Sequence, residues 1–120
     1  MSQEFNKPED GNERQIKWTI HDTNPELVDK MRTKLSEVID PELGYDIIQL
    51  GLVRDFCMEG EVGKLKMILT TPFCPYGPEM IAMTKIKAEV GLGREVTIEM
   101  LPEIWHPGMA EDPELFSWGL

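Results

Sequence analysis

Apolar residues recur along this chain at two different spacings, and these spacings predict the order of its secondary structure elements. Apolar residues recur at helical spacing over 25–39 and 78–90, and they alternate with polar residues over 64–71 and 95–101, as in half-buried strands. A further strand precedes the glycine-containing turn at 59–63, which joins it to the strand at 64–71 as a hairpin. The predicted order is therefore helix, strand, strand, helix, strand.

Individual residues predict where the helices end and which face they bury. Asn24 and Pro25 suit the N-cap and the first position of the first helix. The helix should end near Ile39, because Asp40 precedes a proline and therefore avoids helical geometry. In the second helix, the apolar stripe that we expect to face the core consists of Ala82, Met83, Ile86 and Val90.

Ahead of the first helix, Ile16, Trp18 and Ile20 alternate with polar residues. This alternation fits a short strand at the edge of the sheet. It fits equally well an extended arm that packs its tryptophan on the core, and the sequence leaves both interpretations open.

The order of the elements predicts an α+β fold. The hairpin makes the first two strands antiparallel, and a right-handed helical crossover makes the second and third parallel. We therefore expect a small mixed three-stranded sheet with both helices on one face. In that topology the segments 40–46, 71–74 and 105–107 gather at one end of the sheet, where parallel strands often form ligand sites.

Length and composition bound the classes of function. The 120 residues suffice for one domain, with residues 1–15 as a disordered acidic tail and residues 16–120 as the folded α+β unit. The net charge of −10 argues against binding to nucleic acid, which requires a basic face. No apolar run is long enough to cross a membrane, and two cysteines do not make a disulfide framework, so we expect a cytoplasmic protein.

Cys74 is the residue that most suggests chemistry. It lies in the turn between the strand at 64–71 and the following helix, flanked by Pro72 and Pro75. The prolines stiffen the turn, and the free N–H groups at the start of a helix favour a negative group, so we expect a lowered thiol pKa and a reactive thiolate. The alternative is a buried cysteine that only packs. Cys57 lies on the order of 30 Å away along the strand, and we expect it to pack.

Four sequence blocks together resemble a known family. The chain is similar to the SufT/PaaD-like family, small proteins linked to iron–sulfur cluster assembly and delivery, in the blocks 38–44, 50–53, 69–75 and 105–109. The resemblance implies an α+β fold like that of other iron–sulfur assembly domains. It also implies that Cys74, with Asp40 and Glu42, marks the working edge. His106 departs from the pattern, since the family usually has Thr or Ser after this tryptophan.

The resemblance favours an iron–sulfur cluster assembly or delivery factor, either a carrier or a targeting adaptor. Its partners would be apo iron–sulfur client proteins and the assembly machinery. One thiol cannot hold a cluster, because a [2Fe–2S] unit normally takes about four protein ligands. A cluster would therefore be bound transiently. A carrier would need a homodimer that donates Cys74 twice, together with His106, a carboxylate or an external thiol. The supporting residues would be Asp40, Glu42, Thr71 and His106.

Two other functions use the same loops. In the first, Cys74 is the nucleophile of an enzyme, His106 is its base, and Asp40 or Glu42 orients the histidine. No recognisable catalytic signature surrounds Cys74, so this interpretation ranks below the first. In the second, the chain is an accessory subunit that matures a multicomponent oxygenase, as in the family's other branch. Asp40 and Glu42 can also be turn caps without any chemical role.

Overall fold

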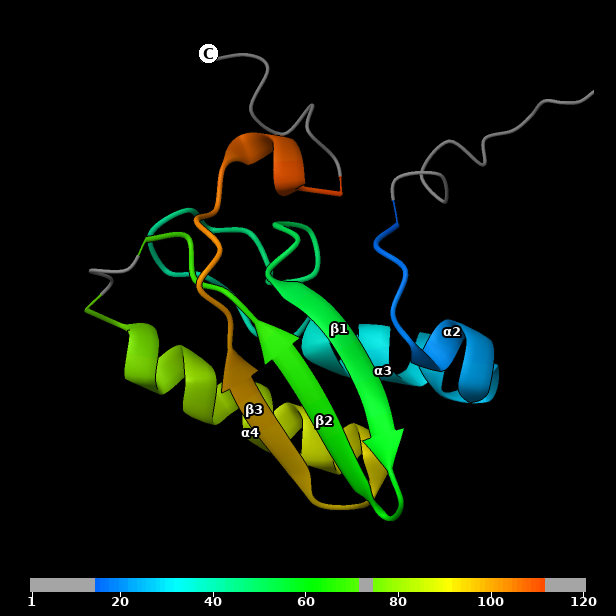
Figure 1. Ribbon diagram of the computed structural model, residues 1–120. Coiled ribbons are helices and arrows are strands. Elements are labelled where there is room, and N and C mark those ends of the chain that lie inside the picture. The colour runs from blue at the N-terminus through cyan, green and yellow to red at the C-terminus, as the bar shows by residue number, and fades with distance from the viewer. Residues whose placement is uncertain (1–14, 72–74, 112–120) are drawn as a thin grey trace, which may run out of the picture.

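The computed structural model describes residues 15–71 and 75–111, and in these ranges it shows a three-stranded sheet covered by helices (Figure 1). The described elements, in chain order, are α2 (Ile20–Thr23), the 3₁₀ turn η2 (Pro25–Leu27), α3 (Val28–Leu35), β1 (Val53–Glu59), β2 (Val62–Met67), α4 (Gly77–Leu92), β3 (Val96–Met100) and the 3₁₀ turn η3 (Pro107–Met109). Apart from Gln15, the predicted N-terminal tail lies outside the described residues.

The sheet has the predicted topology. Its strand order is β1-β2-β3, with β1 antiparallel to β2 and β2 parallel to β3. The hairpin turn between β1 and β2 includes Gly60 at a φ of 64°, a backbone angle that glycine adopts easily. Both α3 and α4 lie behind the sheet in Figure 1 and pack against each other. The expected α+β fold with both helices on one face is confirmed.

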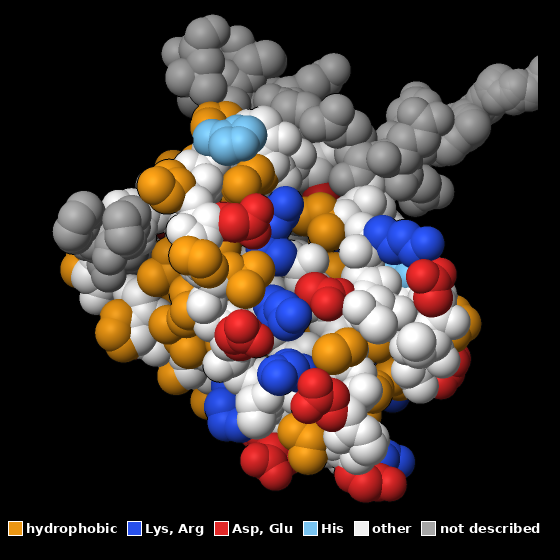
Figure 2. All heavy atoms as spheres, in the orientation of Figure 1, with side chains coloured by type: hydrophobic (Ala, Val, Ile, Leu, Met, Phe, Trp, Pro, Cys, Tyr) orange, Lys and Arg blue, Asp and Glu red, His pale blue; other side chains and the backbone are white. Residues whose placement is uncertain are grey.

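One face of the sheet forms the core and the other faces solvent. The inward side chains of the hairpin, among them Phe56, Leu65 and Met67, are fully buried against Met31 and Leu35 of α3. Two of the three outward positions of β2 are lysines, Lys64 and Lys66, and Figure 2 shows Lys, Arg, Asp and Glu side chains interspersed over this open face. This alternation is typical of a sheet that is covered on one side only. No helix in the described ranges is long and apolar enough to cross a membrane.

The segment before α2 is an extended arm and not a strand. The backbone N–H of Trp18 donates to Nδ1 of His21 (2.9 Å), and the chain turns into α2 at Ile20. The Trp18 side chain is 1% exposed, and its indole N–H donates to the carbonyl of Val53 (3.1 Å). Of the two interpretations of this segment, the arm that packs its tryptophan on the core is the one the structure shows.

The first helix is shorter than predicted and is capped differently. It ends at Leu35, four residues before the predicted end at Ile39. Beyond a turn, the carbonyl of Val38 accepts from the N–H of Ile47 (3.0 Å), and this tertiary contact holds the segment extended. Asn24 makes no side-chain cap, because its Oδ1 instead accepts from the Thr23 hydroxyl (2.7 Å).

The prediction of the buried face of α4 was wrong. Three of the four residues of the predicted stripe are exposed large hydrophobics, namely Met83 (43%), Ile86 (52%) and Val90 (60%), and Ala82 is exposed as well. The helix buries the opposite side, which carries Gly77, Met80, Thr84, Ala88, Gly91 and Leu92. This side carries mostly small residues and therefore lets α3 approach closely. A Cβ on Gly91, for example, would lie 3.0 Å from the Lys34 side chain. Because α4 has apolar residues on both sides, periodicity alone did not select the buried side.

Candidate functional site

The three loop segments that the sequence analysis brought together do leave the same end of the sheet. The register aligns Val53, where β1 begins, with Met67, where β2 ends, and aligns Met67 with Met100 at the end of β3. The chain before β1 and the chains after β2 and β3 therefore meet at this end, which is uppermost in Figure 1. We call it the loop end of the sheet.

Asp40 ties two of these loops together. It is fully buried, and its Oδ1 accepts hydrogen bonds from the backbone N–H groups of Glu42 (2.8 Å) and Leu43 (3.2 Å). Its Oδ2 accepts from the hydroxyl of Thr70 (2.9 Å), which follows β2. These three bonds satisfy a carboxylate that would otherwise be costly to bury. Asp40 therefore fixes the 40–46 turn against the segment that leads to Cys74.

The other predicted site residues of these two loops differ in accessibility. Glu42 is exposed, and only its backbone N–H contacts Asp40. Thr71 is half-buried, and Cys74 itself lies outside the described residues. The chain is described again from Pro75, and α4 begins at Gly77, where a Cβ would lie 3.0 Å from the Leu69 side chain. Glycine at this position therefore lets α4 start directly against the chain that leaves β2.

The C-terminal segment rests on the turn just before β1. The indole N–H of Trp105 donates to the carbonyl of Leu50 (2.7 Å), and the N–H of Glu111 donates to the carbonyl of Gln49 (3.0 Å). Gly51 has a φ of 73°, and a Cβ there would collide with the carbonyl of Met109. The tight turn and the close approach both require glycine at position 51.

His106 is exposed and caps η3. Its Nδ1 accepts from the N–H of Gly108 (3.2 Å), which in this geometry assigns the ring proton to Nε2. His106 and Asp40 have different neighbours. His106 lines a shallow groove with Gln15 and Arg54, and the carboxylate of Asp40 accepts a hydrogen bond from Thr70. The structure thus brings Asp40 to the segment before Cys74 and places His106 on the loop after β3, in a groove of its own.

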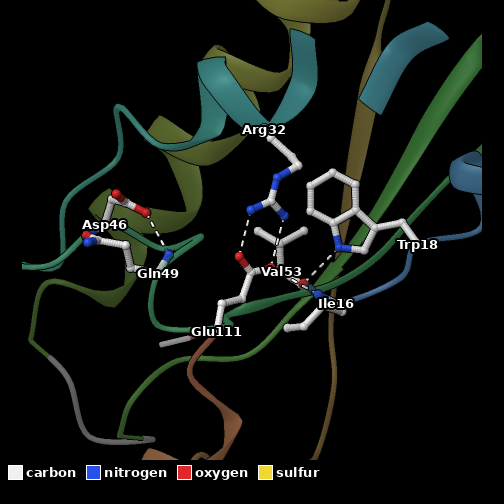
Figure 3. A network of polar contacts seen from close by, with 7 residues as sticks. All are labelled: Ile16, Trp18, Arg32, Asp46, Gln49, Val53 and Glu111. Carbon is white, nitrogen blue, oxygen red and sulfur yellow. Dashed lines mark hydrogen bonds and ion pairs between the residues drawn. The ribbon is translucent and has the colours of Figure 1, made fainter. Parts of the chain in front are cut away.

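A buried ion pair that the sequence did not reveal holds the C-terminal segment in place (Figure 3). Arg32 of α3 and Glu111 form a two-pronged pair, with N–O distances of 2.9 and 2.6 Å, and their side chains are 18% and 12% exposed. Glu111 also accepts from the N–H of Ile16 (3.1 Å), and the Arg32 guanidinium lies 5.9 Å from the centre of the Trp18 ring. Because Arg32 and Glu111 are 79 residues apart, no local pattern predicts the pair.

Among the described residues, Asp46 and Cys57 have raised pKa values, whereas ion pairs with lysines lower the pKa values of Glu37 and Glu89. Burial raises the pKa of Asp46, although its carboxylate accepts from the N–H of Gln49 (2.7 Å), and the nearby charge of Glu111 adds to the rise. Burial also raises the pKa of the Cys57 thiol, and the charges of Asp55 and Glu59 add to this effect. Cys57 therefore has the properties of an unreactive thiol.

Within residues 15–71 and 75–111, no group of three or more His, Cys, Asp or Glu side chains is arranged to hold a metal ion. The buried carboxylate of Asp40 is already engaged on both oxygens. The described residues of the loop end therefore form a set of loops that hydrogen bonds hold to one another.

A small α+β domain of this arrangement is known from solved structures. A protein from Thermotoga maritima described as conserved and hypothetical superposes with a TM-score of 0.66 and 30% identity, over 77% of this chain and 93% of that one. A domain of unknown function from Bacillus anthracis superposes with a TM-score of 0.69 and 24% identity, over 82% and 96% of the two chains. These likenesses confirm the fold.

Sequence comparison identifies the family. The model of the family described as "Iron-sulfur cluster assembly protein" matches residues 29–100. The chain belongs to this family. It is 38% identical over 77 residues to the Fe-S protein maturation auxiliary factor SufT of Staphylococcus aureus, covering 62% of this chain and 84% of that protein. It is 33% identical over 87 residues to the Fe-S protein maturation auxiliary factor YitW of Bacillus subtilis, covering 72% and 83%. The resemblance to SufT-type proteins is confirmed.

Proposed function

We propose that this protein is an auxiliary factor in the maturation of iron–sulfur proteins and that it works at the loop end of its sheet. The observation that carries the proposal is the family match over residues 29–100, which spans the whole sheet, α4, all but the first residue of α3, and the position of Cys74 in the sequence. The two relatives named as Fe-S maturation auxiliary factors align over most of their own length. Relatives of this kind are named as maturation factors, which favours assembly or delivery over catalysis. The protein would meet clients and assembly machinery in a reducing cytoplasm.

The finer part of the proposal is that Cys74 is the working thiol. A thiolate is the protein ligand best suited to iron–sulfur chemistry. The chain on both sides of this cysteine is anchored, by the Thr70–Asp40 hydrogen bond before it and by the Gly77–Leu69 contact after it. Such anchoring lowers the entropy lost when a loop residue engages a partner. Cys57 is a poor alternative, because its raised pKa disfavours the thiolate.

The cluster is cargo in this proposal and not a resident group. One thiol supplies too few ligands for stable binding, so the remaining ligands must come from a client, a donor or a small external thiol. His106 is a weak candidate for one of them. While its Nδ1 accepts from Gly108, the proton sits on Nε2, the nitrogen that would have to bind the metal. The described carboxylate of Asp40 positions the loop and does not reach the cargo, since both its oxygens are engaged.

A transfer assay tests this proposal. Wild-type protein is incubated anaerobically with iron and sulfide, and cluster formation is followed by visible absorbance; transfer to an apo-client is followed by recovery of the client's activity. We expect Cys74→Ser to abolish transfer without lowering the melting temperature. The matched control is Cys57→Ser, which should retain transfer. If Cys74→Ser transfers as well as wild type, the thiol-centred proposal is wrong and the protein acts through docking alone.

A further inference from the structure

The exposed apolar face of α4 calls for an explanation that the proposed function does not supply. Met83 (43%), Ile86 (52%) and Val90 (60%) are large hydrophobics left open on one side of this helix, and Tyr76 (44%) at its N-cap and Ile39 (50%) are exposed as well. Together they form an apolar surface of about a few hundred Å², a size that on monomeric proteins often marks an interaction site. We call this surface the α4 patch.

The α4 patch is shaped to receive a helix. Between α4 and the 37–41 segment runs a groove with a volume of about 660 Å³, with Val38 and Met80 at its floor and Ile39 and Met83 at its sides. Tyr76, Met83 and Val90 follow one another at intervals of seven residues, and Ile86 lies between the last two. A seven-residue repeat with an apolar residue in between is the spacing that lets one helix pack along another.

We infer that the α4 patch is a homodimer interface, in which the α4 helices of two copies pack antiparallel about Met83. The sequence of the patch is symmetric about this residue. In an antiparallel pair centred on Met83, each residue meets the one equally far on the other side of the centre. Tyr76 therefore meets Val90 of the second copy, Met83 meets its own counterpart, and Ile86 comes level with Met80 at the floor of the groove.

The charges of the patch follow the same symmetry. Glu79 lies four residues before Met83 and Lys87 lies four residues after it, so each glutamate comes level with the lysine of the second copy. This match occurs at both ends of the contact, as a twofold axis requires. Glu79 is exposed and has no ion-pair partner among the described residues, whereas Lys87 is held at 2.8 Å by Glu37. A second copy would therefore add the partner that Glu79 lacks.

The interface should be weak and should tighten with salt. The patch is smaller than the roughly 800 Å² per partner of a standard interface, so we expect a dissociation constant in the micromolar range or above. Each copy carries a net charge of −10, so the two copies repel each other, and salt screens this repulsion. The exposed Glu79–Lys87 pairs contribute too little to reverse the trend.

The geometry of this dimer also bears on whether its two copies could bind one metal cluster between them. With a rise of about 1.5 Å per residue, the two Tyr76 residues lie about 21 Å apart along the helix axes. Pro75, the first residue described before Tyr76, would therefore lie at opposite ends of the interface in the two copies, which disfavours a cluster shared between them. Each copy would then act on its cargo alone, and the dimer proposal stands or falls independently of the proposed function.

Sedimentation of the full chain over a wide concentration range tests the interface. We expect wild type to dimerise and the dimer to tighten between low and high salt. Met83→Glu places two carboxylates opposite each other at the centre and should raise the dissociation constant roughly a hundredfold or more. The matched control, Ile104→Glu, changes an exposed isoleucine outside the patch (76% exposed) and should leave the dissociation constant unchanged.

Oxidative cross-linking tests the symmetry itself. In a background with Cys57→Ser and Cys74→Ser, Met83→Cys should form a covalent dimer on mild oxidation, and Ile104→Cys should not. A wild-type chain that stays monomeric, or a dimer that survives Met83→Glu, overturns the proposal. If the monomer instead binds a basic amphipathic peptide at the α4 patch, with an affinity that falls as salt rises, the surface belongs to a different partner and the dimer is excluded.

Discussion

The hydrogen bonds of Asp40 predict how much this residue stabilises the fold, and this effect can be measured separately from any effect on cluster transfer. In Asp40→Ala, the two backbone N–H groups of Glu42 and Leu43 and the hydroxyl of Thr70 all lose their acceptor. A hydrogen bond to a charged group contributes about 1.5–3 kcal/mol, and neutral bonds about 1 kcal/mol. Water can reach part of the exposed turn, so we expect a loss of about 3–4 kcal/mol, a large share of the roughly 5–15 kcal/mol that stabilises a typical domain.

Two further variants show how much of this loss of stability comes from the Thr70 bond and how much from the Glu42 side chain. Thr70→Val removes only the bond to Oδ2 and should cost about 1–2 kcal/mol. Glu42→Ala leaves the backbone N–H in place and changes only an exposed side chain, so it should stay within about 0.5 kcal/mol of wild type. If Glu42 nevertheless supports cluster transfer, this variant will transfer more slowly while remaining as stable as wild type.

Urea denaturation followed by circular dichroism measures these differences, with the transfer assay run in parallel on the same samples. Asp40→Asn is the near-isosteric control. It keeps the oxygen that serves the two backbone N–H groups, and its amide can donate to the Thr70 hydroxyl, so most of the stability should remain. A single hydrogen bond contributes about 1 kcal/mol. This account of the turn is refuted if the free energy of unfolding of Asp40→Ala lies within about 1 kcal/mol of the wild-type value.

Three further predictions concern other contacts. Glu111→Gln breaks the two-pronged buried ion pair and should cost about 2–3 kcal/mol in urea denaturation, whereas Glu103→Gln, in a looser and more exposed pair, should stay within about 0.5 kcal/mol. Gly51→Ala adds a collision to an unfavourable φ and should cost over about 2 kcal/mol, whereas Gly60→Ala, with open space, should cost about 1 kcal/mol. At neutral pH, Cys57 should react with iodoacetamide more slowly than a free thiol does, because its raised pKa disfavours the thiolate. Its contribution to stability is present below the unfolded thiol pKa and lost as pH rises through the raised folded pKa, and urea denaturation at a series of pH values checks this.

Local pattern alone predicted the elements of the sheet and their connection. The alternation in β2 and β3, the glycine-containing hairpin and the single helix between parallel strands leave few topologies, because crossovers are right-handed and consecutive elements stay adjacent. The same topology, deduced from the order of the elements, predicted that the three loops meet at one end of the sheet. These features depend on neighbours in sequence, and a single sequence contains that information.

What the sequence did not determine depends on partners far away along the chain. The buried side of α4 was predicted wrongly because both sides are apolar, and close packing of Gly91 against α3 decided between them. The helix α3 stops early because Val38 bonds to Ile47, and the arm at Trp18 bends because its indole reaches Val53.

The candidate site divides in the same way. Asp40 was identified from its turn, before Pro41, but only the structure shows that its carboxylate reaches Thr70, 30 residues away. Arg32 and Glu111, 79 residues apart, left no signal at all. The sequence determines which short segments are stiff and at what spacing their apolar residues recur, since these are properties of residues that are close together along the chain. The tertiary structure decides which side chains are buried together, because burial and ion pairing depend on distances in space that a single chain's pattern does not encode.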